Sequence, residues 1–160
     1  MPDFEISARV NGEGVRRRVK ARQSLADFLR DDLGLTATHL GCEHGVCGAC
    51  TIIVDGEIVR SCLYLAAQID GRDVETLEGL SDRGELSELQ AAFLARNAAQ
   101  CGFCTPGMLI TARDLLSRSP NPDRAEIRDH LSGNLCRCTG YQAIVEAVLD
   151  AAESAGKVPA

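Results

Sequence analysis

The chain has 160 residues, of which 45% are hydrophobic and only 4% aromatic, and it contains no tryptophan. This length allows one domain of ordinary size or two small ones, and a small domain with so few aromatic residues needs another source of stability, such as a bound metal. The net charge of -6 argues against nucleic acid as a partner.

The first half of the chain predicts short strands separated by turns. Three segments alternate apolar and polar residues or contain a hairpin signal: 4–10 (FEISARV), 14–21 (GVRRRVKA) and 51–59 (TIIVDGEIV). Between the second and third segments, residues 24–34 predict a short helix with Ser24 as its N-cap. Strands interleaved with one helix indicate a small α+β unit.

From Leu86 onward the apolar residues recur at helical spacing. Four helices with short connections are predicted, which suggests a compact bundle. The four segments are 87–99, 106–119, 122–133 and 140–156. Because Gly, Ser and Asp collect in residues 77–85, we place a boundary there and predict two domains, 1–78 and 79–160.

The eight cysteines fall into two groups of four, one in each half. The first group has C-x4-C-x2-C spacing and a more distant fourth cysteine, which is the spacing of plant-type ferredoxins that bind a 2Fe-2S cluster. Glycines in its loop, GCEHGVCGAC, allow backbone N–H groups to point at cluster sulfurs. We predict that the ligands of this cluster are Cys42, Cys47, Cys50 and Cys62.

The second group combines a C-x2-C pair with a C-x-C pair. Its members are Cys101, Cys104, Cys136 and Cys138. The last cysteine of each pair precedes a threonine, a good N-cap, and then Pro106 or Gly140 at the predicted first helical position. Both pairs are therefore expected at helix N-termini, where the helix dipole favours thiolates and an anionic cluster. The two pairs are interpreted as halves of one metal site.

Disulfides, structural zinc and inert thiols are the alternatives to iron-sulfur clusters. Disulfides need an oxidising compartment, but no apolar run could span a membrane and MPDFEISARV lacks the parts of a secretion signal, so we expect a cytoplasmic protein. Structural zinc stays open for the second group, because C-x2-C also occurs in zinc sites. Inert buried thiols could explain one or two cysteines, but not two sets of four.

Several motifs resemble one known family. They are GCEHGVCGACT, SCLYLAAQ, VETLEGL, LQAAF, QCGFCTPGM and GNLCRCTGY. Together with their connecting lengths they resemble the small iron-sulfur subunit of the xanthine oxidase family of molybdenum hydroxylases, which includes carbon monoxide dehydrogenases, xanthine dehydrogenases and aldehyde oxidoreductases. The match covers residues 3–153 and all eight cysteines. It implies an α+β fold class, with an N-terminal β-grasp 2Fe-2S ferredoxin-like domain followed by an all-α four-helix-bundle 2Fe-2S domain.

The resemblance also implies a function, which is that of the electron-transfer subunit of an oxidoreductase complex. Electrons would pass from the molybdopterin cofactor of a large subunit through two 2Fe-2S clusters to FAD on a medium subunit, in a heterotrimer repeated as a dimer. The second cysteine group would hold the molybdenum-side cluster and the first group the flavin-side cluster. Gln100 and Cys138 would contact the pterin; without the resemblance, Gln100 is interpreted as a solvated residue at a helix end.

Two rival functions remain, a stand-alone two-cluster ferredoxin-like carrier and a structural zinc protein. Three further features have plain interpretations. His44 is interpreted as a solvated loop residue, Phe103 as a shield of its cluster from water, and the basic run 16–22 as a solvated strand face, with docking to a partner as the alternative for that run.

Overall fold

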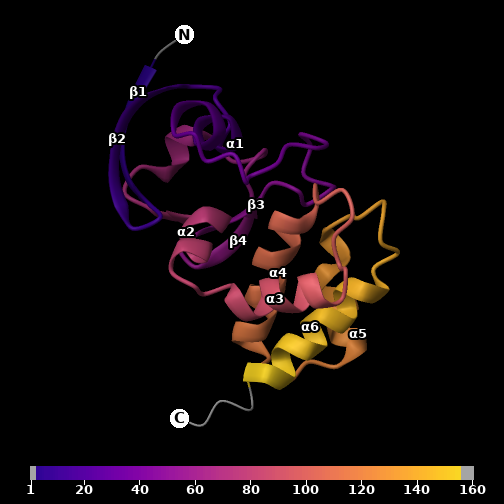
Figure 1. Ribbon diagram of the computed structural model, residues 1–160. Helices are drawn as coiled ribbons and strands as arrows, with labels where there is room; N and C mark the ends of the chain where they lie inside the picture. Colours follow the sequence, from indigo (N-terminus) through magenta and orange to yellow (C-terminus); the bar gives the residue numbers. More distant parts are fainter. Residues whose placement is uncertain (1–2, 156–160) are drawn as a thin grey trace.

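Two hydrophobic cores organise the computed structural model, which describes residues 3–155. The first core lies within the sheet half, at the upper left of Figure 1, and the second lies among the helices below it. Ile53 belongs to the second core and Ile58 packs against it, although both residues lie on strands. The two halves therefore share apolar packing.

The sheet half is a mixed five-stranded sheet in the order β2-β1-β5-β3-β4. Its strands are β1 (Asp3–Val10), β2 (Glu13–Lys20), β3 (Thr51–Val54), β4 (Glu57–Arg60) and β5 (Asp73–Glu75). Strand β1 pairs antiparallel with β2 and parallel with β5, and β3 pairs antiparallel with both β5 and β4. The hairpin signal at Asp55-Gly56 is confirmed, because both residues have the positive φ that a tight hairpin turn requires.

The predicted helix at residues 24–34 is confirmed at its start. The Ser24 hydroxyl accepts a hydrogen bond from the Asp27 N–H (3.0 Å) and caps α1 (Leu25–Asp27). The helix continues as a wider π-helical turn, η1 (Phe28–Asp32), and the side chains of Leu25, Phe28 and Leu29 are fully buried against the sheet. A 3-10 turn, η2 (Ala66–Ile69), adds Ala66 and Ile69 to the same core.

The second half is helical, as predicted. Its helices are α2 (Leu77–Asp82), α3 (Ser87–Ala95), α4 (Thr105–Arg118), α5 (Arg124–His130), the 3-10 turn η3 (Leu131–Gly133) and α6 (Gln142–Ala155). Helix α2 was not predicted; it occupies the region where Gly, Ser and Asp suggested a boundary. The proposed division at 78/79 falls inside α2 and stays a prediction. The predicted last residue of the final helix, 156, lies outside the described residues.

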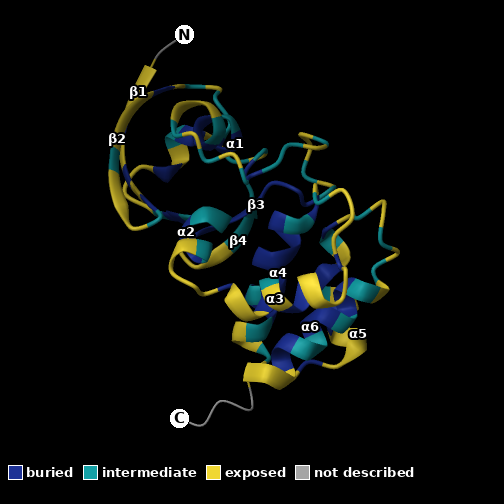
Figure 2. Ribbon diagram, viewed as in Figure 1, coloured by how far each residue is buried: buried dark blue, intermediate teal, exposed yellow. Residues whose placement is uncertain are grey.

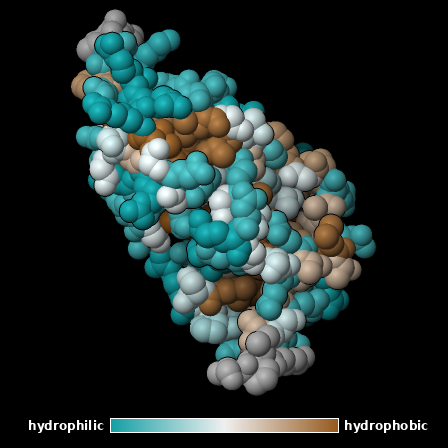
Figure 3. Space-filling model, turned by 60° about the vertical axis from the view of Figure 1, so that its left-hand side comes forward, coloured by the Kyte–Doolittle hydropathy of each residue, from teal (hydrophilic) through white to brown (hydrophobic). Residues whose placement is uncertain are grey.

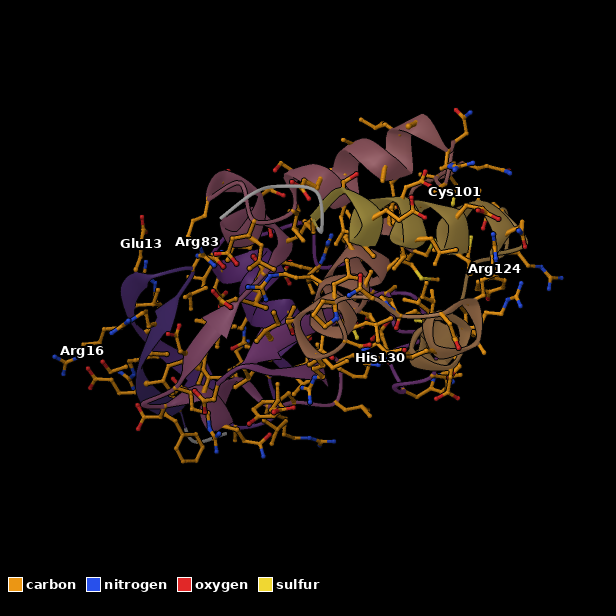
Figure 4. The ribbon with its side chains drawn as sticks, turned by 90° about the horizontal axis from the view of Figure 1, so that it is seen from below. Glu13, Arg16, Arg83, Cys101, Arg124 and His130 are labelled. Atoms are coloured by element: carbon orange, nitrogen blue, oxygen red, sulfur yellow. The ribbon has the colours of Figure 1, made fainter. Side chains whose placement is uncertain are left out.

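The basic run on β2 lies at the end of the molecule opposite the second cysteine group. Figure 4 shows Arg16 pointing outward from the sheet, far from Cys101. Arg16 forms an ion pair with Glu5, and Arg18 lies 3.8 Å from Asp3, both on β1, while Val19 on the other face is buried. Pairing with the neighbouring strand favours the interpretation of a solvated face.

The face shown in Figure 3 is mostly hydrophilic, with apolar colour confined to separate patches. None of the helices within residues 3–155 combines the length and apolar content needed to cross a membrane.

A buried polar junction joins the two halves around Asn134. The Asn134 side-chain amide donates to the carbonyl oxygen of Gly48 (3.1 Å), and its side-chain carbonyl accepts from the Thr111 hydroxyl (3.1 Å). The Arg60 guanidinium, at the end of β4, donates to the Gly133 carbonyl oxygen (2.7 Å) and to the Thr51 hydroxyl (2.6 Å). These bonds tie the loop after η3, helix α4 and the sheet to one another.

Backbone segments approach closely at this junction because glycines leave room. A Cβ atom on Gly48 would lie 2.4 Å from the Gly133 carbonyl oxygen, and Gly48 has a φ of +74°. A Cβ on Gly107, in the first turn of α4, would lie 2.3 Å from the Gly48 carbonyl oxygen. Figure 2 shows α4 largely buried between the sheet and the other helices. The first turn of α4 is therefore held against the first cysteine loop.

A second link joins α4 to the sheet further along the helix. The Arg118 guanidinium donates to Glu57 at the start of β4 (2.9 Å) and to Asp114 (3.0 Å). Asp114 is buried, and its other carboxylate oxygen contacts His130 Nε2 on α5 (3.0 Å), so this buried carboxylate has both of its oxygens bonded.

We expect Gly107→Ala to destabilise the folded protein by about 1–3 kcal/mol, because the added methyl group overpacks a backbone contact. The measurement is the denaturation midpoint of the cluster-loaded chain, followed by visible absorbance and circular dichroism. Gly14→Ala on β2 is the matched control, since a Cβ there meets no atom within 4 Å. Equal midpoints for the two variants would contradict the tight junction.

Candidate metal centres

The structure brings the four cysteines of the first group together. Cys42, Cys47 and Cys50 lie on the loop between η1 and β3, and Cys62 lies just after β4. Cys42 and Cys47 lie close together, as do Cys62 and Cys50, and the charge of Cys42 also acts on Cys62. All four are free cysteines.

Backbone amides in this loop point at sulfur, as the glycine pattern predicted. The Cys47 N–H donates to Cys42 Sγ (3.4 Å) and, with further N–H groups from His44 and Val46, lowers the pKa of Cys42 to about 6. Burial raises the pKa of Cys62 to about 11, and its contact with Cys50 acts in the same direction. The first group therefore has one side, at Cys42, where backbone N–H groups stabilise a thiolate. On its more buried side, at Cys62, a thiolate needs a compensating positive charge.

The second group also assembles, although its two pairs are about thirty residues apart. Cys138 Sγ lies 3.5 Å from Cys101 Sγ, and Cys104 lies close enough to Cys136 to affect its pKa. Each contact joins one cysteine of the C-x2-C pair to one of the C-x-C pair. The structure therefore brings the two pairs together, and their role as ligands of one metal site stays a prediction.

The second group has an outer and an inner edge. Cys101 and Cys138 are exposed, as is Gln100, whereas Cys104 is buried and Cys136 half-buried. Burial raises the pKa of Cys104 to about 12. For Cys136, burial acts to raise the pKa, but hydrogen bonds from Thr139 and nearby backbone outweigh it and leave the pKa lowered.

The predicted helix caps in the second group were wrong. Cys104, not Thr105, is the N-cap of α4, and Pro106 is the second helical residue. Gly140 has a φ of +65° and lies outside the helix, because α6 begins at Gln142. The first pair thus lies at a helix N-terminus, but the second pair lies in a loop before α6. Pattern alone could not show this, since Cys-Thr steps occur in both places.

The donor set fits two-iron clusters. A 2Fe-2S cluster bound by four cysteines takes two thiolates on each iron, and both groups present their thiols as two pairs. Across residues 3–155, no three His, Cys, Asp or Glu side chains are arranged as ligands of one metal ion. A structural zinc ion also takes four cysteine ligands, and the comparisons with known proteins below decide between the two metals.

The two cysteine groups are neighbours in space. The Leu135 N–H donates to the Cys47 carbonyl oxygen (2.8 Å), which connects the residue before Cys136 to a cysteine of the first group. In Figure 1 the loops that carry these residues lie on the same side of the molecule, at the right of the view. Sequence analysis missed this contact and Asn134 beside it, because cysteine spacing carries no information on the packing of one loop against another.

Aromatic and histidine side chains lie between the two loops. The His39 ring stacks on Phe103, with centroids 4.7 Å apart, and its Nδ1–H donates to the Phe103 carbonyl oxygen (2.8 Å). Phe103 is 47% exposed, so the idea that it shields its cluster from water stays a prediction. His44 is exposed and contacts the Cys42 carbonyl oxygen, which agrees with its interpretation as a solvated loop residue.

Comparison with known proteins identifies two cluster-binding regions. Residues 8–81 match the family described as 2Fe-2S iron-sulfur cluster binding domain, and residues 76–149 match the [2Fe-2S] binding domain family. The chain is 61% identical over 147 residues to the nicotine 6-hydroxylase small subunit of Paenarthrobacter nicotinovorans, covering 92% of this chain and 88% of that one. It is 44% identical over 147 residues to the xanthine dehydrogenase iron-sulfur-binding subunit of Escherichia coli O157:H7, covering 91% and 92%.

A solved structure agrees with the fold. A chain of quinoline 2-oxidoreductase from Pseudomonas putida 86 superimposes with a TM-score of 0.91 at 51% identity, covering 96% of each chain. The predicted α+β fold, with a ferredoxin-like domain followed by a helical one, and the prediction of two 2Fe-2S clusters are confirmed.

The assignment of individual ligands stays a prediction that substitution can test. Cys136→Ser should remove or destabilise one cluster and leave the other intact, because the four predicted ligands of each cluster all come from a single cysteine group. Cys62→Ser should affect the opposite cluster. Electron paramagnetic resonance of the reduced protein distinguishes the two signals. Two unchanged signals in Cys136→Ser, or loss of the same signal in both variants, would show that the grouping is wrong.

Proposed function

We propose a function for this chain from one premise: it belongs to the family of small iron-sulfur subunits of xanthine dehydrogenase-type molybdenum hydroxylases. The chain is the electron-transfer subunit of an oxidoreductase complex. It passes electrons from a molybdopterin centre on a large partner subunit, through its two clusters, to FAD on a medium partner subunit. One-electron transfer is the chemistry that 2Fe-2S clusters supply when bound.

The observation that carries this proposal is the hydrogen bond between the two cysteine loops. The Leu135 N–H and the Cys47 carbonyl oxygen are 2.8 Å apart, and each belongs to a proposed ligand residue or its direct neighbour. A short covalent and hydrogen-bonded route therefore connects the two sites. The Asn134 junction fixes its length, because Asn134 and Gly48 adjoin the two bonded residues.

The two edges of the second group support the proposed order of the partners. Cys104 and Cys136 lie on the inner side, next to the junction, so the exposed pair Cys101 and Cys138 is the side open to another molecule. Gln100 is exposed next to Cys101. We place the pterin contact of the large subunit here, at Gln100 and Cys138, and the flavin side at the first group.

Exposed apolar side chains support docking of partners at both groups. Four of the large exposed hydrophobic residues directly adjoin a cysteine: Val46, Leu63, Phe103 and Leu135, with exposed fractions of 56%, 62%, 47% and 50%. A hollow of about 490 Å³ lies between α3 and the start of α4 and is lined by Phe93, Leu94, Ala99 and Leu109, among others. Apolar surface around both proposed clusters suits permanent interfaces that exclude water from electron transfer.

The wider assembly follows the same reasoning. We propose a heterotrimer, repeated as a dimer, in the cytoplasm, where a reducing environment keeps thiols available for metal.

Nicotine, quinoline and xanthine, named in the relatives, are all nitrogen heterocycles. We therefore propose a nitrogen-heterocyclic substrate, which reacts on the large partner and does not touch this chain.

Purification of the chain from its native source tests the assembly. We expect a large and a medium subunit to co-purify, together with molybdenum, flavin and about four irons per copy of this chain, as two 2Fe-2S clusters require. When a nitrogen heterocycle is added, the clusters of the isolated complex should become reduced, and their visible absorbance should decrease. A red monomer without molybdenum or flavin would instead establish the stand-alone carrier.

Replacing an apolar residue beside the first group tests the docking surface. We expect Val46→Asn to weaken association with the medium subunit about tenfold, because a polar amide left unpaired in an apolar interface costs about 1–3 kcal/mol and about 1.4 kcal/mol is tenfold in affinity. Binding is measured by titrating cluster-loaded chain against that subunit. Phe4→Asn on β1 is the control, since Phe4 is similarly exposed (46%) but far along the sheet from the cysteines. Equal weakening by both changes would place the interface elsewhere.

A further inference from the structure

A chain of three hydrogen bonds closes around Cys136. The Thr139 hydroxyl oxygen lies 3.1 Å from Cys136 Sγ and accepts a hydrogen bond from the Tyr141 N–H (3.1 Å). The Tyr141 hydroxyl, in turn, accepts a hydrogen bond from the Cys136 N–H (2.9 Å). Thr139 and Tyr141 thus hold both the sulfur and the backbone of Cys136.

The direction of the bond to sulfur follows from proton counting. A threonine hydroxyl has one proton and two lone pairs, and one lone pair of Thr139 is occupied by the Tyr141 N–H. A cysteine that ligates metal is a thiolate and has no proton to donate. With Cys136 as a ligand, the Thr139 O–H must therefore donate to Cys136 Sγ.

The backbone around this chain is specialised for the contact. Tyr141 has a φ of +68°, a left-handed conformation that is unfavourable for a bulky residue, and it follows Gly140, which has a φ of +65°. These two left-handed residues turn the chain back so that the Tyr141 N–H faces Thr139. Tyr141 also packs against the core of the helical half, and its carbonyl accepts the Val145 N–H of α6 (2.9 Å). The donor is thereby fixed to a rigid element.

The other Cys-Thr step of the same site makes no such contact. Thr105 follows Cys104 as Thr139 follows Cys138, but the Thr105 hydroxyl oxygen is buried and has no hydrogen-bond partner within the described residues. The two steps look equivalent in sequence and differ in the structure. Only one threonine of the site is placed to donate to a sulfur atom.

We propose that Thr139 is a positioning residue that tunes the second-group cluster by donating a hydrogen bond to Cys136 Sγ, with Tyr141 holding its hydroxyl in place. Hydrogen bonds to cluster sulfurs set reduction potentials, because they stabilise the extra negative charge of the reduced cluster. Loss of this bond should make that cluster harder to reduce. The proposal rests on the assignment of Cys136 as a ligand.

Thr139→Val, which keeps the shape and removes the hydroxyl, is the direct test. We expect the equilibrium constant for reduction of the second-group cluster, in the full cluster-loaded chain, to fall about tenfold. For a one-electron couple this lowers the reduction potential by about 59 mV. The first-group cluster should not change. Redox titration followed by electron paramagnetic resonance measures both potentials. Thr105→Val is the matched control and should leave both potentials unchanged, and Thr139→Ser should restore the potential of the unaltered chain.

The outcomes separate the proposal from its premise. An unchanged potential in Thr139→Val, or an equal shift in Thr105→Val or Thr139→Ser, would overturn the role of the hydroxyl. If Thr139→Val did not retain its second cluster, Thr139→Ala and Thr139→Ser would be compared: loss in Ala with retention in Ser supports the proposal, and loss in both overturns it. Retention of both clusters in Cys136→Ser with unaltered signals would instead refute the ligand assignment beneath it.

Discussion

The fit of two glycines and Asn134 at one buried junction is the constraint on which the rest of the structure depends. Gly48 and Gly107 let backbone atoms approach where any Cβ would collide, and Asn134 fills the remaining hydrogen-bonding needs of that contact. Unbonded polar groups in this position would cost about 1–3 kcal/mol each, so the contact is bonded on all sides. The junction joins two halves that differ in fold.

Rigidity at this place matters because both cysteine loops begin or end there. Cys47 precedes Gly48, and Leu135 and Cys136 follow Asn134, so every part of the junction is covalently continuous with a proposed ligand. Electron transfer between redox centres falls steeply with distance, and a hinge between the halves would vary that distance. A junction built from backbone contacts and a buried amide connects the two sites within this chain.

Much of this architecture could be predicted from sequence, because cysteine spacing, strand alternation and helical periodicity each reflect a local requirement. Ser24 as a cap, the Asp55-Gly56 turn and the grouping of the thiols into two sites all follow from such local rules. Non-local features did not follow. The caps at Thr105 and Thr139 were predicted wrongly because a Cys-Thr step does not reveal whether a helix starts immediately or after a left-handed turn. The role of Asn134 could not be predicted, because its partners Gly48 and Thr51 lie more than eighty residues away in the sequence.

The second cysteine group shows how folding makes unequal sites from equal motifs. Its two Cys-Thr steps have the same local chemistry, but one begins α4 and leaves its hydroxyl without a partner among residues 3–155, while the other enters a left-handed turn and places its hydroxyl beside sulfur. The thiols are likewise unequal, with Cys101 and Cys138 open to solvent and Cys104 buried next to the junction. A symmetric cradle would give a cluster no preferred side. This asymmetric one has an outer edge open to solvent and an inner edge that adjoins the loop of the first group, so the two sides of the site differ in burial.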